Sequence, residues 1–473
     1  MSRNQSIQPG SMDGRRENMT SARNQIFTAL LATIPTFTYG IQIGWLSPMG
    51  PLLKSANTPA RVPVTDNAIS WMAAALPLAA ICGIPFFSYA SDRFGRKICI
   101  IGVSFLSSIS WTIKLTLVTP AALTVARVIA GLAASGCFVV VPVYVKEISE
   151  DSWRGALASL TMTVCKLGVI FVYAVGMSVS YVGNQAIYLA VAASHVLLFC
   201  FMPESPNYML KNGNEKKAAK TIAWLRSVHK SDKIVIDELA KLKTDRCLYE
   251  AMPRVTVMSV VRDKATFSAL RVTLVLMGMQ TLSGCFALMN YAADVFKRAG
   301  TEWSPNTLAL FMGSLQLAGS FFTTMSIEKF GRKLPLACSS LLVSICMTTL
   351  ATYFLIGGES VRWLPVLAVC VCILAYGAGL APVPMVVMAE VFTFQMRARM
   401  AGASMAFSFF CSSMTVLFYT PVANEFGEYV VFYTFAAVTL LGVFYTVFCV
   451  PETKGKSLDE IQRYWKKPEP VFV

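Results

Sequence analysis

Long apolar runs separated by short polar loops dominate this chain. Each run holds about twenty residues, which is the length of α-helix needed to cross about 30 Å of hydrocarbon. Six runs fall at about 25–47, 69–90, 98–118, 121–145, 156–178 and 185–201. Six more fall at about 270–295, 308–327, 334–355, 364–388, 401–422 and 429–450. The pattern predicts an all-α membrane protein with twelve transmembrane helices.

Three polar segments interrupt this pattern. Residues 1–25 are rich in Ser, Asn, Gln and Arg, and we expect a disordered tail there. Residues 203–265 carry Lys and Arg together with apolar residues at loosely helical spacing, which favours amphipathic helices on a membrane surface. The predicted organisation is a tail over 1–25, a six-helix bundle over 26–202, surface helices over 203–265, a second bundle over 266–450 and a tail over 451–473.

The composition agrees with a membrane protein. The chain is 55% hydrophobic and 14% charged, whereas a soluble chain carries about 25% charged residues. The net charge of +15 does not indicate nucleic acid, because the bases gather at the ends of apolar runs. The 13 Cys lie mostly inside apolar runs and there are only two His, so we expect no metal and no cofactor. Because the chain has no Walker loop and no nucleophile–base–acid set, we do not expect an enzyme.

The distribution of Lys and Arg predicts the orientation. Of 41 such residues, one lies within a span, Lys166, and seven lie at or near the outer ends of spans if both termini are cytoplasmic, which leaves 41 − 1 − 7 = 33 inside. Those seven are Lys54, Arg61, Lys114, Arg127, Lys297, Arg298 and Arg362. Bases accumulate on the cytoplasmic side of membrane proteins. We therefore expect a multi-pass protein of the cell membrane with both termini in the cytoplasm.

Charged motifs recur between the two halves of the chain. Asp92-Arg93-Phe94-Gly95-Arg96-Lys97 returns as Glu328-Lys329-Phe330-Gly331-Arg332-Lys333, with an offset of 331 − 95 = 236. Glu147 and Arg154 return as Glu390 and Arg397, and Pro203-Glu204-Ser205 returns as Pro451-Glu452-Thr453. Three motifs that recur in the same order in both halves indicate an internal duplication.

The recurring charges favour a gate. All eight fall at the predicted cytoplasmic ends of helices: Asp92, Arg96, Glu147, Arg154, Glu328, Arg332, Glu390 and Arg397. Opposite charges there can bridge the two bundles when a central cavity faces outward, and they must part when it opens inward. Isolated exposed pairs contribute about 0–1 kcal/mol, but a network can bias a two-state equilibrium. Topogenic charge alone does not account for the matched acids.

Several motifs resemble the signatures of the sugar porter branch of the major facilitator superfamily. They are the two Gly95 and Gly331 loops, Pro142-Val143-Tyr144 with Glu147 and Arg154-Gly155, Pro203-Glu204-Ser205-Pro206 and Pro451-Glu452-Thr453-Lys454-Gly455. The resemblance covers roughly residues 25–465. Ser70-Trp71, Leu76-Pro77-Leu78 and Lys456-Ser457-Leu458-Asp459-Glu460-Ile461 look closest to facilitated trehalose transporter-like proteins. The resemblance to the sugar porter branch implies two six-helix bundles around a midplane cavity that opens alternately to either side.

The resemblance also implies a substrate site, and the chain departs from the family there. Where the resemblance implies four amides and two tryptophans, the chain has Met162, Thr281, Phe286, Met385, Ser408 and Phe409. Gln280 and Gln316 remain. The expected cavity is therefore more apolar than a site for sugar hydroxyls should be.

Lys166 adds a charge to this region. It lies four residues after Met162, so both project from one helical face near the middle of the bilayer. Two interpretations stay open: a binding charge for an anionic or carbonyl-bearing solute, or a side chain that snorkels or meets a structural partner. Proton-driven relatives carry an acid at the position of Leu46, so the resemblance favours facilitated diffusion.

Three functions follow from these observations. The first is a facilitative uniporter for a small-molecule solute, trehalose or a hexose by resemblance. The second is a carrier of the same fold for a less polar or anionic solute. The third is a non-transporting sensor or scaffold, against which the matched gate charges argue, since an inert protein does not need them.

The predicted topology can be tested by labelling. A cysteine introduced at Asn57 should react with an impermeant maleimide added to intact cells, because that loop is expected outside. A cysteine at Asn212 should react only after permeabilisation, with the parent chain as background. The reverse pattern of labelling would overturn the orientation.

Overall fold

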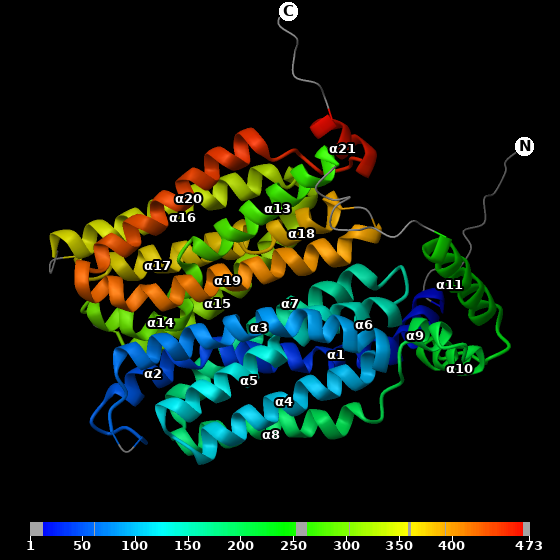
Figure 1. The fold of residues 1–473 in the computed structure, drawn as a ribbon, viewed down its shortest axis with the longest axis horizontal. Coiled ribbons are helices and arrows are strands. Elements are labelled where there is room, and N and C mark those ends of the chain that lie inside the picture. Colours follow the sequence, from blue (N-terminus) through cyan, green and yellow to red (C-terminus); the bar gives the residue numbers. More distant parts are fainter. Residues whose placement is uncertain are drawn as a thin grey trace, which may run out of the picture.

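A computed structural model describes residues 13–60, 62–251, 263–301, 303–357, 361–392 and 394–466. Within these residues it contains twelve helical spans that are long and apolar enough to cross a membrane. The spans form two stacked groups of six, and a helical linker lies beside the end of the first group (Figure 1). The predicted number of spans and their division into two bundles are confirmed.

The first bundle comprises α1 (Asp13–Gly44), α2 (Leu46–Lys54), α3 (Asp66–Phe94), α4 (Arg96–Thr116), α5 (Pro120–Val139), α6 (Val141–Ile148), α7 (Arg154–Ser178) and α8 (Tyr181–Phe199). The linker holds α9 (Pro206–Lys211), α10 (Glu215–Arg226) and α11 (Lys233–Ala251). The second bundle comprises α13 (Lys264–Leu282), α14 (Cys285–Arg298), α15 (Pro305–Phe330), α16 (Lys333–Ile356), α17 (Leu364–Ala375), a π-helical turn (Tyr376–Leu380), α18 (Val383–Val391), α19 (Phe394–Phe426) and α20 (Glu428–Cys449). The tail forms α21 (Leu458–Lys466).

Every third span is broken, which the apolar pattern did not predict. The first span breaks between α1 and α2, the fourth between α5 and α6, the seventh between α13 and α14, and the tenth at the π-helical turn. Proline or glycine lies at each break, and Gly284 before α14 adopts a φ of +82° that favours glycine. The breaks at Gly284 and at the π-helical turn fall near the middle of their spans, whereas those at Trp45 and Val140 fall nearer one end.

Small residues let helices within a bundle approach closely. At the crossing of α1 and α7, a Cβ placed on Gly40 would lie 2.0 Å from the carbonyl oxygen of Cys165. A Cβ placed on Gly168 would lie 2.1 Å from the carbonyl oxygen of Phe37. Such glycine contacts give tight van der Waals packing where no hydrophobic effect drives association. They tie α1 and α7 into one unit.

The two bundles are joined by polar contacts at one end of the molecule. We call the end that carries the Gly95 and Gly331 turns the loop end and the other the far end. At the far end Lys54 Nζ on α2 lies 2.7 Å from Asp294 Oδ2 on α14. The amide of Ala293 there donates to Ser47 Oγ at 3.3 Å. These contacts join the first bundle to the second.

Exposure along α7 shows how the interface opens. Tyr173 is 1% exposed and donates to the carbonyl oxygen of Met289 on α14 at 2.8 Å. Three turns nearer the loop end on the same face of α7, Met162 is 39% exposed. Because this face is the one turned toward the second bundle, the space between the bundles widens toward the loop end.

The linker docks on the loop end of the first bundle through Arg226. Its guanidinium is 1% exposed and donates to Glu238 at 2.7 Å and 3.0 Å, to Gln25 at 3.1 Å and to the carbonyl oxygen of Ile148 at 3.0 Å. Asn24 donates to the carbonyl oxygen of Trp224 at 2.7 Å. These contacts join α10, α11 and α1.

The expected disorder of residues 1–25 is therefore wrong from residue 13 onward. Residues 13–25 belong to α1, because Asn24 and Gln25 hydrogen-bond to the linker and to the loop before α7. Residues 1–12 lie outside the described part. At the end of this segment, Asn24 and Gln25 use their polar side chains to contact the linker and the loop before α7.

Two of the bases counted at or near the outer ends of spans, Lys114 and Arg127, are buried inside the first bundle. Lys114 is fully buried between the rings of Trp45 and Trp111, with Nζ 4.2 Å and 4.1 Å from their centroids, and donates to Gln42 Oε1 at 2.5 Å. Arg127 donates to the carbonyl oxygens of Met72 and Gln42. Aromatic faces and carbonyl dipoles satisfy these cations.

The linker contact yields a test of stability. Replacing Arg226 by Ala leaves the Glu238 carboxylate without its guanidinium partner, and breaking such a buried pair costs about 3 kcal/mol. We expect a lower thermal unfolding midpoint and faster tryptic cleavage within 203–251.

The matched control is Lys243→Ala, which removes an ion pair to Glu215 whose side chains are 46% and 56% exposed. Such pairs contribute about 0–1 kcal/mol, so this variant should behave like the parent. Equal behaviour of the two variants would contradict the docking role of Arg226.

Candidate functional site at the loop end and the bundle interface

A charge cluster at the loop end holds the first bundle together. Arg96, the first residue of α4, has Nε 3.1 Å from Glu147 Oε2 on α6 and Nη2 3.4 Å from Asp92 Oδ1 on α3. Ser205 at the start of the linker donates to the same Glu147 carboxylate. Glu204 accepts from the amides of Arg96 and Lys97 at 3.0 Å and 3.1 Å. One cluster therefore joins α3, α4, α6 and the linker.

The second bundle repeats this arrangement. Arg332 donates through Nη2 to Glu390 on α18 at 2.6 Å, and Glu328 lies 4.0 Å away. Thr453 donates to Glu390 Oε2 at 2.5 Å. Glu452 accepts from the amides of Arg332 and Lys333 at 3.0 Å and 3.1 Å. The cluster joins α15, α16, α18 and the tail.

The two clusters show the recurring charges without a bridge between the bundles. The ion pairs that join Asp92, Arg96, Glu147, Glu328, Arg332 and Glu390 to one another stay within one bundle. The predicted bridge belongs to the arrangement in which the cavity faces outward, and it stays a prediction. Arg154 pairs with Asp151 of its own loop at 2.5 Å, and Lys241 of the linker lies 2.7 Å from that Asp151. The side chain of Arg397 lies outside the described residues. These contacts brace each bundle at a point where the bundles are apart.

Two acids in the clusters were not assigned from the sequence. Glu204 and Glu452 each accept from the first amides of a transmembrane helix, where the positive end of the helix dipole favours a carboxylate. Burial raises the pKa of Glu204, and its amide donors only partly oppose this. Burial also acts on Glu452, but its amide donors outweigh burial and lower its pKa. The repeated Pro-Glu-Ser/Thr motif was the signal that could have identified both.

The candidate binding residues nearest the interface lie on α7 and α15. Lys166 Nζ contacts Ser320 Oγ on α15 and so reaches from the first bundle to the second. Ser320 donates to the carbonyl oxygen of Gln316 at 3.0 Å, one turn away. The Gln316 amide is 5% exposed and donates to Met289 Sδ at 3.4 Å. The structure thus brings Lys166 close to Gln316 through Ser320, a residue the sequence did not single out.

The other candidates are spread over α13, α14, α18 and α19. Gln280 donates to the carbonyl oxygen of Ala381 at 2.9 Å, next to the tenth-span break. The Thr281 hydroxyl bonds to its own helix, at the carbonyl oxygen of Met277. Phe409 is 6% exposed and packs edge-on against Phe138 of the first bundle, with centroids 5.7 Å apart. Phe286, Met385 and Ser408 are partly buried on three different helices.

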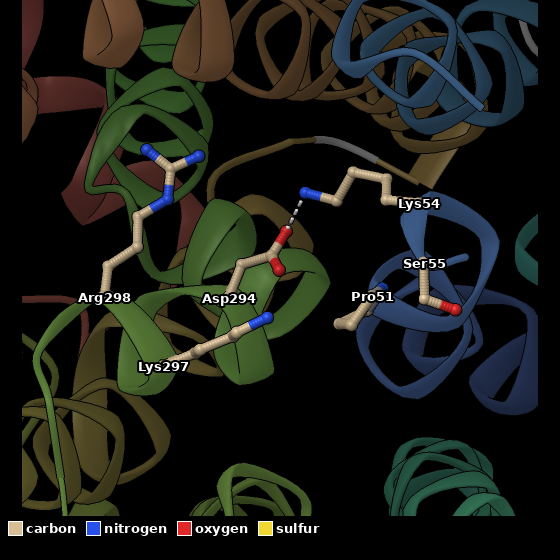
Figure 2. A pocket seen from close by; sticks show the side chains of 6 residues that line it. All are labelled: Pro51, Lys54, Ser55, Asp294, Lys297 and Arg298. Atoms are coloured by element: carbon tan, nitrogen blue, oxygen red, sulfur yellow. Dashed lines mark hydrogen bonds and ion pairs between the residues drawn. The ribbon is translucent and has the colours of Figure 1, made fainter. Parts of the chain in front are cut away.

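A cavity of about 370 Å³ lies between the bundles at the far end. It is lined by Pro51, Lys54 and Ser55 from the first bundle and by Asp294, Lys297 and Arg298 from the second. Figure 2 shows Lys54 reaching across this cavity to Asp294. Lys54 also lies 3.2 Å from Asp66, and Arg298 lies 3.0 Å from Glu428. The cavity is therefore part of the far-end closure.

Comparison with known proteins places this geometry in a family. A family model described as sugar (and other) transporter matches residues 28–465. Facilitated trehalose transporter Tret1 of Polypedilum vanderplanki is 28% identical over 454 residues, which cover 93% of this chain and 87% of that protein. Tret1 of Aedes aegypti is 27% identical over 444 residues, 93% of this chain and 55% of that protein. The chain spans little more than half the length of the Aedes protein.

Solved structures agree with the fold. The inward-open xylose transporter XylE of E. coli has a TM-score of 0.77 at 19% identity, over 93% of this chain and 100% of that one. The proton:xylose symporter XylE bound to 6-bromo-6-deoxy-D-glucose has a TM-score of 0.72 at 18% identity, over 94% and 100%. The expected fold, two six-helix bundles of the major facilitator type, is confirmed.

A double-mutant cycle tests whether the loop-end charges act within a bundle. Arg96→Ala and Glu147→Ala should each lower the thermal unfolding midpoint, and the double variant should lose less than the sum, because both substitutions break one contact.

The matched pair is Arg96→Ala with Glu390→Ala, one from each bundle, whose effects should add. Additivity for Arg96 with Glu147 together with coupling between Arg96 and Glu390 would restore the bridging geometry.

Proposed function

This chain belongs to the sugar (and other) transporter family, and from that premise we propose that it is a facilitative transporter of trehalose or a hexose. The observation that carries the proposal is the distribution of contacts between the bundles. At the far end they are joined by Lys54–Asp294, whereas the loop-end charges are paired within each bundle. This is the arrangement of a carrier that is closed at one end and open at the other.

Alternating access follows from these contacts. Each loop-end cluster ties three helices and a flanking segment into one body, so a bundle can tilt without losing its internal ion pairs. Tilting about the middle would separate Lys54 from Asp294 and bring the loop ends together. A solute held between the bundles would then face the opposite side.

The surroundings of Arg127 support uniport. In the first bundle this buried cation donates to two backbone carbonyl oxygens, those of Met72 and Gln42. A carboxylate beside it would be the natural site of proton exchange, yet the chain has Leu46 where proton-driven relatives carry an acid. The solute would therefore move down its own gradient.

We propose that the protein lies in the cell membrane and that its loop end faces the cytoplasm. The Lys and Arg of both turns, the linker and the tail support this orientation, since bases accumulate on the cytoplasmic side. The linker helices and α21 lie at the same end of the molecule (Figure 1). Both termini would then be cytoplasmic.

Reconstitution tests the proposed activity. Full-length protein in liposomes preloaded with unlabelled trehalose or glucose should take up the same radiolabelled sugar by counterflow, above empty vesicles. The exchange should be saturable but weak, because each sugar hydroxyl left unpaired costs about 1–3 kcal/mol.

A protonophore should leave this exchange unchanged, and net uptake should stop when the inside and outside concentrations are equal. Exchange of neither sugar, or accumulation that depends on an imposed proton gradient, would contradict facilitated sugar transport.

A further inference from the structure

The contact of Lys166 differs from those of Lys114 and Lys54, two other lysines in or beside the spans. Lys114 is enclosed by two indole rings and Gln42, and Lys54 has the carboxylates of Asp294 and Asp66. The contact found for the Lys166 ammonium is the neutral hydroxyl of Ser320. Among the ion pairs of the described residues, none includes Lys166.

Its depth rules out escape to the membrane surface. Lys166 is 166 − 154 = 12 residues into α7, about 18 Å from the start of the helix at 1.5 Å per residue. A lysine side chain spans only a fraction of that distance. A cation at this depth that lacks a counter-charge is expensive, and in membrane proteins such groups line solute pathways.

The position also gives access from the loop end. Lys166 lies between Met162, which is 39% exposed, and Tyr173, which is 1% exposed, on the face of α7 turned toward α15. It therefore sits where the opening between the bundles closes. A solute that enters from the loop end meets the ammonium at the inner limit of that opening.

We propose that Lys166 binds the carboxylate of a sugar acid, so that a polyhydroxy carboxylate is bound more tightly than the neutral sugars that the carrier also moves. This rests on the proposed transport function and names its substrate class. A carboxylate supplies the charge that Ser320 lacks, and charge-assisted hydrogen bonds are roughly twice as strong as neutral ones. Gln316, one turn from Ser320, carries an amide whose contact is the weak acceptor Met289 Sδ, so a solute hydroxyl can replace that contact.

Loss of family amides fits the same substrate class. Met162 replaces one on the same face of α7 as Lys166, so a neutral sugar loses a hydroxyl partner there. One ionic contact offsets the loss only for a solute that carries a negative charge. Because Lys166 and Ser320 come from different bundles, a carboxylate held between them would remain bound to one bundle as the two separate.

Competition in proteoliposomes tests this assignment, with gluconate as the acidic probe and glucose as its neutral counterpart. Full-length protein should exchange radiolabelled gluconate, and unlabelled gluconate should compete at least tenfold better than glucose. An inside-positive membrane potential should accelerate gluconate uptake and leave glucose uptake unchanged.

Variants then assign the effect to the charge. Lys166→Met should lose gluconate exchange at least tenfold while glucose exchange persists, which also shows that the variant is folded; Lys166→Gln should do the same. Lys166→Arg should retain gluconate exchange, and Lys217→Met, an exposed linker lysine, should equal the parent.

Two results would overturn the assignment: absence of gluconate exchange, or gluconate exchange that Lys166→Met leaves intact. The experiments with the neutral sugars distinguish failure of this assignment from failure of the proposed function. If glucose or trehalose exchanges and gluconate does not, sugar transport stands and the role of Lys166 is wrong. If no solute exchanges, both are wrong.

Discussion

A charge within or beside a bilayer needs a partner, and the choice of partner decides which helices move together. At the loop end the partners come from the same bundle: Arg96 with Glu147, and Arg332 with Glu390. At the far end Lys54 pairs across the interface with Asp294. Pairs of the first kind make each bundle rigid, and pairs of the second kind must break for the bundles to move. The ion pairs between the bundles therefore determine which end of the molecule is closed.

The rest of the fold is consistent with this division. Glycine contacts between α1 and α7 bring backbones close inside one bundle, where a larger residue would push them apart. The side-chain contact of Lys166 with Ser320 crosses between bundles and involves a neutral hydroxyl, which is easily exchanged for another group. The breaks in the seventh and tenth spans fall near the middle of those spans and interrupt their helical hydrogen bonding there. Discontinuous helices of this kind form the midplane solute sites of transporters built from repeats.

The bilayer explains why the fold could be predicted from the sequence. Its thickness fixes the length of each span, so a count of apolar runs was enough to find twelve helices. The repeat between Gly95 and Gly331 indicated two equivalent bundles. The partners of the charges could not be predicted in the same way, because they depend on which helix ends meet in space. Glu204 and Glu452 reach Arg96 and Arg332 from more than a hundred residues away.

The site was predicted less completely than the fold for the same reason. Lys166 was identified by its depth alone, but Ser320 lies 154 residues away and has no sequence signal of its own. The helical start of the first span was missed because Asn24 and Gln25 find their partners, Trp224 and Arg226, about 200 residues further along the chain. Thr281 and Gln280 donate to backbone carbonyl oxygens, and these partners too could not be predicted from the sequence; their place in a solute site stays a prediction.

Distances between spin labels test most directly whether the Lys54–Asp294 pair holds the far end closed. Exposed native cysteines would be replaced by Ser, with labels at Ser88 and Met325 near the loop end and at Thr116 and Ile356 near the far end. Lys54→Ala removes the far-end pair. The account predicts that this change lengthens the Thr116–Ile356 distance and shortens the Ser88–Met325 distance in the same population. Distances that both stay fixed, or that lengthen together, would contradict it.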